Sequence, residues 1–161
     1  MSAEYPLHRG EIRAFRTTKH QIVTALAVRC IGENGGRALV IDGSARIDPY
    51  WMVRICKKYG YDQNNVLKRT IVGRGFTAYQ LENMVKDVRK IVETSGDISF
   101  LGLIDFSSRF QDDDMNEDEG IWLCSAGVKE LKRTVDEFSL YCVVADKKPE
   151  LFLDHGGESG G

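Results

Sequence analysis

The 161-residue sequence is 42% hydrophobic and 29% charged, which is typical of one globular domain with its own hydrophobic core. It contains no apolar run of about 18 residues and no apolar segment near its start, so we expect neither a membrane-spanning helix nor secretion. The net charge of −2 combines +6 over residues 1–110 with −8 over residues 111–161.

The first half of the chain predicts two strands, each followed by a helix. A strand over 11–15 precedes a helix that starts at Thr17 or Thr18, one of which caps it, and runs to Ile31, with Gly32, Gly35 and Gly36 ending it. The apolar run over 37–42 predicts a strand buried on both faces. Pro49 then opens a helix that stops at Gly60.

The second half continues the alternation. It predicts strands over 66–73, 98–105 and 140–145, a helix between Thr77 and Gly96, and a helix over 121–138. Such alternation favours an α/β fold with a parallel sheet and helices on both faces. We therefore expect an N-terminal tail over 1–9, a core over 10–148 and a flexible tail over 149–161.

The segment 10–29, with a strand, a tight turn carrying Lys19 and a helix, has the layout of a nucleotide-phosphate loop. Loops of the G-x-x-x-x-G-K-[ST] type use glycine so that backbone N–H groups can surround the phosphates. When the motif is aligned on Lys19, Arg13 and Thr18 occupy the glycine positions, and His20 occupies the magnesium-binding Ser/Thr position. The segment has the position of a phosphate loop in the chain, but it lacks the glycines and the magnesium-binding hydroxyl that such a loop uses.

The strand ends together resemble the core of the RecA/RadA recombinase family over about residues 10–148. The resemblance is carried by the following residues in order: Ile41-Asp42, Arg46, Pro49, Gly60, Asp62, Val66-Leu67, Ile71, Arg74, Phe76-Thr77-Ala78, Gln80 and the run LGLIDFSSRF that contains Asp105. It implies a RecA-like, P-loop NTPase-type sheet, truncated after its fifth strand.

The resemblance also implies that the catalytic chemistry is lost. Ser44 stands where the family has the glutamate that polarises water, and a serine cannot act unaided as a general base. Asp105 matches the magnesium-linked carboxylate, but the residue that would share the metal is His20. We expect a pseudo-ATPase with no catalytic residues and no cofactor, with weak ATP and magnesium binding through Lys19 and Asp105 left open.

Several of these residues also have simpler interpretations. Lys19 fits a surface lysine at a helix start, and Asp42 fits a turn former before Gly43. Asp105 fits a structural hydrogen bond as well as a metal-linked role. Trp51 and Trp122 fit core or partner-facing anchors. The histidines are not spaced as a metal site.

An acidic run lies where the family has a DNA-contacting loop. It consists of Asp112, Asp113, Asp114, Glu117, Asp118 and Glu119. Its self-repulsion predicts a mobile loop, and its charge opposes a DNA backbone. We expect this loop either to contact a basic partner surface or to keep DNA away.

The functional prediction is a recombinase paralogue that binds a RecA-fold subunit or the recombinase and assists homologous-recombination DNA repair, with DNA contacted only through a complex. The alternatives are a RecA-fold scaffold subunit, like the ATP-motif-free subunits of the Elongator assembly, and a weak ATP-binding regulator. The four cysteines are far apart, which favours buried thiols in a reducing compartment. We expect the nucleus or the cytoplasm.

Overall fold

A computed structural model of the chain describes residues 7–44, 46–111 and 115–153. Five parallel strands form one sheet in the order β1-β5-β4-β2-β3. They are β1 (Ile12–Arg16), β2 (Arg37–Asp42), β3 (Thr70–Arg74), β4 (Ile98–Ile104) and β5 (Tyr141–Asp146). Because all five run the same way, their carboxyl ends meet at one edge of the sheet, which we call the carboxyl edge.

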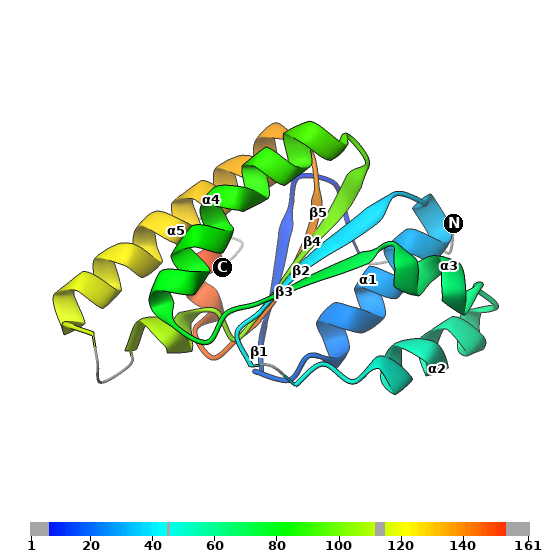
Figure 1. The fold of residues 1–161 in the computed structure, drawn as a ribbon, viewed down its shortest axis with the longest axis horizontal. Helices are drawn as coiled ribbons and strands as arrows, with labels where there is room; N and C mark the ends of the chain where they lie inside the picture. The colour runs from blue at the N-terminus through cyan, green and yellow to red at the C-terminus, as the bar shows by residue number, and fades with distance from the viewer. Residues whose placement is uncertain (1–6, 45, 112–114, 154–161) are drawn as a thin grey trace.

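Helices cover both faces of the sheet (Figure 1). One layer consists of α1 (Gln21–Asn34), α2 (Pro49–Tyr59) and α3 (Gln63–Lys68), and the other of α4 (Ala78–Ser95) and α5 (Glu117–Glu137). Two short 3-10 helices, η1 (Ser107–Gln111) and η2 (Pro149–Phe152), follow β4 and β5. The predicted α/β architecture with helices on both faces is confirmed.

Each layer has its own hydrophobic core. Leu81, Val85 and Val88 of α4 pack with Leu131 and Val135 of α5 against one face of the sheet. The other face packs mainly against α1. Most of α1 is buried because this helix contacts both the sheet and α2. The central strands β4 and β5 are almost entirely buried, as expected for strands covered on both faces.

The helix signals read from the sequence agree with the structure for α2 and α4. Asp48 caps α2, Pro49 is its first residue, and Gly60 ends it in the left-handed conformation. Thr77 and Gln80 form a capping box at the start of α4. These local signals fix both helices within the fold.

Three predicted boundaries were wrong at the ends of α1 and β3. Neither Thr17 nor Thr18 caps α1, which begins after His20 without a side-chain cap, and Gly32 lies inside the helix, which ends at Gly35. The run 66–73 is not one strand, because α3 occupies its first residues and β3 begins at Thr70. The side chain of Asp62 caps α3 by accepting hydrogen bonds from the Asn64 and Asn65 N–H groups, which stabilises the start of this helix.

The acidic run was also misassigned. Glu117, Asp118 and Glu119 form the first turn of α5 rather than a mobile loop, and the side chain of Asn116 accepts hydrogen bonds from the backbone of Asp118 and Glu119. Carboxylates are favoured at this position because the helix dipole is positive there. Asp112, Asp113 and Asp114 lie outside the described residues.

The predicted N-terminal tail ends too late, and the predicted C-terminal tail begins too early. Leu7 is buried against the α1 layer, so the folded core starts before residue 10. Phe152 of η2 is 1% exposed and its ring meets that of Phe106 edge-on, with centroids 6.1 Å apart. The segment Pro149–Phe152 therefore belongs to the core and not to a flexible tail, while residues 154–161 lie outside the description.

We expect Phe152→Ala to lower the free energy of unfolding by about 3–5 kcal/mol, because it removes a buried aromatic ring. The matched control is Leu151→Ala in the same short helix, where the side chain is 37% exposed and the expected loss is below about 1 kcal/mol. Urea unfolding followed by circular dichroism measures both. Equal stability of the two variants would contradict the placement of η2 in the core.

Candidate functional site

The turn between β1 and α1 stands where a phosphate loop would, but it has a different backbone. Thr17, Thr18, Lys19 and His20 connect the two elements. Among the described residues, only Asp105 and Ser139 combine a side chain with a positive φ, so all four turn residues have negative φ. The Thr17 hydroxyl accepts a hydrogen bond from the Lys19 N–H at 3.1 Å, which engages one of the turn's donors internally. This backbone lacks the left-handed residues that aim N–H groups at an anion.

The Lys19 and His20 side chains have opposite surroundings. Lys19 is exposed, as its simpler interpretation predicts. His20 is 4% exposed and joins α1 to the start of α2. Its Nδ1 lies 2.9 Å from the Thr24 hydroxyl, and its Nε2 accepts a hydrogen bond from the Asp48 N–H at 3.1 Å. A ring that accepts at Nε2 is neutral, and burial lowers the pKa of His20 although Asp42 and Asp48 act in the opposite direction.

The ends of β2 and β4 meet at Gly43. The Gly43 N–H donates to the carbonyl of Ile104 at 2.8 Å, and a Cβ at Gly43 would lie 2.4 Å from the carbonyl oxygen of Asp105. The Arg109 Nε donates to the Gly43 carbonyl at 2.7 Å and ties η1 to this contact. Only glycine fits at this position without moving one of the two backbones.

Asp42 and Ser44 interact directly across this turn. Asp42 is fully buried, and its Oδ1 accepts from the Ser44 N–H at 2.8 Å and from the Ser44 hydroxyl at 2.7 Å. Asp42 therefore forms the turn that its simpler interpretation predicts. Ser44 is held by this turn, and its hydroxyl also accepts from the Arg46 N–H.

Asp105 follows β4 with φ 52°, a conformation that costs energy for a residue with a side chain. Its N–H donates to the carbonyl of Ala145 at 2.8 Å, which places it beside the end of β5. Its carboxylate accepts from the Ser108 hydroxyl at the start of η1. The structure thus brings Asp105 next to Gly43 and the end of β2, while Lys19 follows β1, which β5 separates from β4.

Asp146 lies at one of the strand ends that the sequence offers as positions for chemistry, but no role was predicted for it. It ends β5, is fully buried, and accepts from the Ser107 N–H at 3.0 Å, from the Ser107 hydroxyl and from the Lys148 N–H at 2.9 Å. The available signal was a carboxylate directly after a run of buried strand residues. Because its partners come from a segment 39 residues away, the sequence did not show them.

The predicted partner residues differ in exposure. Trp51 is half-buried, and its Nε1 donates to the Gln21 carbonyl at 3.1 Å, so it anchors α2 to α1. Trp122 is 68% exposed on α5. Glu119 accepts a hydrogen bond from the Tyr79 hydroxyl at 3.2 Å and thereby links α5 to α4. Glu117 and Asp118 are exposed.

The described part of the chain contains no group of three or more His, Cys, Asp or Glu side chains placed to hold a metal ion. None of its helices has both the length and the apolar character needed to cross a bilayer. The four cysteines are buried as free thiols.

A parallel five-stranded sheet between two helical layers, with a strand-turn-helix unit at its start and carboxylates at the strand ends, defines a RecA-like α/β domain. The family model described as Rad51 matches residues 10–147. The chain therefore belongs to the Rad51 family, within the RecA/RadA recombinase type. A search of curated proteins gives no match.

The buried His20 predicts a specific pH dependence of stability. Since its folded pKa lies below the ordinary value of 6.5, the unfolded chain binds this proton at higher pH than the folded protein. The contribution of neutral His20 to the free energy of unfolding is complete above pH 6.5 and is lost as the pH falls through the folded pKa. The free energy of unfolding then changes by at most about 1.4 kcal/mol per pH unit. We expect His20→Gln to reduce this slope in urea titrations between pH 7.5 and 5, values chosen to span the ordinary histidine range of about 6.5.

The matched control is His8→Gln, because His8 is exposed in the described structure. This variant should keep the slope of the unchanged protein. The assignment of a neutral, buried His20 would be wrong if the two variants gave the same dependence on pH.

Proposed function

We propose that this chain is a non-catalytic member of the recombinase family that binds another RecA-fold protein and assists homologous-recombination DNA repair. The partner is a RecA-fold paralogue subunit or the recombinase itself, and DNA is contacted through the complex. The family match supports a recombinase-related role. The remainder of the proposal is supported by the chemistry of the carboxyl edge and by the exposed apolar surface.

The main observation is that the polar groups of the carboxyl edge are hydrogen-bonded to one another. Serine hydroxyls donate to the carboxylates that end β2, β4 and β5, and His20 bridges two helices. A catalytic site needs groups aimed at the reacting atoms of a substrate. Here Ser44 is engaged by Asp42, and the turn before α1 lacks the backbone of a phosphate cradle. These contacts favour a domain that folds without nucleotide and acts by binding.

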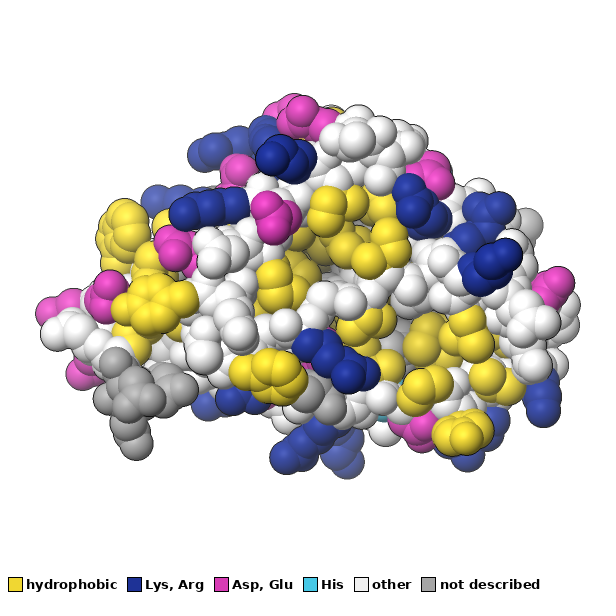
Figure 2. All heavy atoms as spheres, in the orientation of Figure 1, with side chains coloured by type: hydrophobic (Ala, Val, Ile, Leu, Met, Phe, Trp, Pro, Cys, Tyr) yellow, Lys and Arg dark blue, Asp and Glu magenta, His cyan; other side chains and the backbone are white. Residues whose placement is uncertain are grey.

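A surface suited to a partner lies at the β3 end of the sheet. Within the described sheet, β3 is a terminal strand and pairs only with β2, so one side of its backbone is open to pairing. Val72 is 38%, Phe76 56% and Tyr79 51% exposed, and we call these three residues the β3 surface. Figure 2 shows hydrophobic side chains between the two helical layers on the face that it draws. Aromatic residues at an open sheet edge are typical anchors for a protein partner.

We expect no ATP hydrolysis and no nucleotide binding that depends on Lys19. Isothermal titration of Mg-ATP into the protein, with a phosphate-release assay, measures both. The matched control for Lys19→Ala is Lys147→Ala, an exposed lysine that follows β5. Binding that is lost in Lys19→Ala and kept in Lys147→Ala would contradict the proposal and favour a weak ATP-binding regulator.

We expect an affinity pull-down from the native cell to recover a RecA-fold recombination protein. Phe76→Ser should reduce that recovery by about tenfold, since a buried aromatic anchor contributes a large share of binding energy. Tyr50→Ser is the control, because Tyr50 is 79% exposed on α2, away from the β3 surface. Recovery of a tRNA-modification complex without any recombinase-type subunit would refute the proposal.

A further inference from the structure

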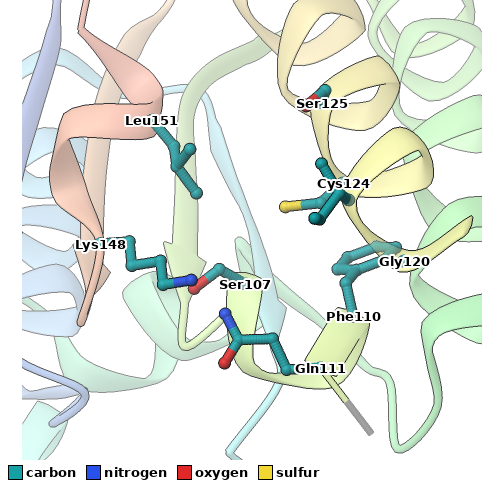
Figure 3. Close-up of a pocket in the computed structure, with 9 residues that line it drawn as sticks. Ser107, Phe110, Gln111, Gly120, Cys124, Ser125, Lys148 and Leu151 are labelled. Carbon is teal, nitrogen blue, oxygen red and sulfur yellow. The ribbon is translucent and has the colours of Figure 1, made fainter. Parts of the chain in front are cut away.

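A half-open pocket of about 160 Å³ lies between η1, the start of α5, and η2 (Figure 3). Its walls are mainly apolar and include Phe110, Ile121, Cys124 and Leu151, with Lys148 at its border. Figure 3 shows the Cys124 and Leu151 side chains facing the space from α5 and η2. We call this feature the α5 pocket.

The pocket is built from well-packed elements. Gly120 lets α5 lie directly against η1, since a Cβ there would be 2.1 Å from the Phe110 carbonyl oxygen. Phe110 packs on Phe106, with ring centroids 5.0 Å apart, so the wall it provides is tied to the core. Burial raises the pKa of Cys124 to about 11, which keeps its thiol neutral at physiological pH. The pocket therefore offers a fixed apolar wall rather than a reactive group.

The entrance of the pocket carries exposed apolar side chains on both sides. Ile121 is 59% and Leu151 37% exposed. Large apolar side chains gathered around a concavity mark an interaction site more strongly than single exposed ones do. An apolar cavity of about 150 Å³ can hold benzene, so this pocket has room for one aromatic or aliphatic side chain.

The charges beside the pocket indicate what kind of segment fits it. Glu117 is one helical turn before Ile121, so its carboxylate continues the α5 side of the entrance, and Asp118 is the next residue of the same helical turn. Both are exposed, and neither forms an ion pair with a described residue. They attract a basic group placed next to the side chain that enters the pocket.

We propose that the α5 pocket docks a segment of a partner protein that inserts one aromatic or aliphatic side chain between Ile121 and Leu151 and places arginine or lysine beside Glu117 and Asp118. This inference rests on the proposed partner-binding role and adds a second contact with stated chemistry. It is separate from the β3 surface, which lies at the other end of the strand order, whereas η2 contacts β1.

The test uses the full chain and a fluorescein-labelled peptide that carries a leucine-phenylalanine pair beside two arginines. Fluorescence anisotropy measures its affinity, and ¹⁵N chemical shifts locate its site. We expect shifts confined to residues around the pocket and an affinity about tenfold weaker in Ile121→Ser. The double variant Glu117→Gln, Asp118→Asn should weaken binding about fivefold at low salt and less at high salt.

The matched control is Tyr50→Ser on α2, because Tyr50 (79% exposed) is a large exposed side chain like Ile121 (59% exposed) and belongs to neither the α5 pocket nor the β3 surface. It should bind the peptide as the unchanged protein does, and a peptide with serines in place of the apolar pair should not bind. Circular dichroism confirms that each variant is folded. Absence of binding at about 1 mM peptide, a range in which even weak contacts are detected, would refute the inference.

Two further results would also refute it: binding that Ile121→Ser retains, and binding that Tyr50→Ser weakens. The pull-down and the peptide titration can fail separately. Peptide binding without recovery of a RecA-fold partner would refute the proposed function and leave the pocket as a docking site. Recovery of that partner without peptide binding would refute only the pocket.

Discussion

The contact of Gly43 with the end of β4 is the constraint on which the carboxyl edge depends. With a Cβ excluded there by the Asp105 carbonyl, the two backbones approach closely enough for the Gly43 N–H to bond to Ile104. The same approach presents the Gly43 carbonyl to Arg109 and buries Asp42 beside its turn. Because Arg109 belongs to η1, this contact also positions the segment that forms one wall of the α5 pocket.

Hydrogen bonds to the strand-end carboxylates, of which Asp42 and Asp146 are buried and Asp105 is half-buried, explain how this edge can be stable without a ligand. A buried charge is costly unless hydrogen bonds satisfy it, and here the donors are hydroxyl and backbone groups of nearby segments. The Ser44 hydroxyl donates a hydrogen bond to Asp42. The hydroxyls of Ser108 and Ser107 donate to Asp105 and Asp146, respectively. The strand-end carboxylates thus belong to an internal hydrogen-bond network of serine hydroxyl and backbone N–H groups.

The sequence predicted the elements whose signals are local, and it failed where a contact distant in the chain decides. Local signals mark the helix ends: the start of α4 lies at Thr77 and Gln80, and α2 begins at Pro49 and ends at Gly60. His20 could not be recognised as buried, because its partner Asp48 lies 28 residues away. Phe152 is likewise packed against Phe106, which is distant in the sequence. The acidic first turn of α5 was predicted as a loop because the repulsion between its charges was considered without the favourable helix dipole. The strand ends that carry the candidate residues do meet at one edge of the sheet, whereas the hydrogen bonds among these residues were not predictable.

The beginning of α5 separates the two surfaces that we assign to partners. On one side Glu119 bonds to Tyr79 of the β3 surface, and on the other Gly120, Ile121 and Cys124 line the α5 pocket. The two surfaces are therefore connected through one helix. Two weak contacts on one partner, or one contact on each of two partners, would then gain from effective concentration without any catalytic step. In a domain whose carboxyl edge is hydrogen-bonded internally, binding energy of this kind is the property on which the proposed partner-binding role depends.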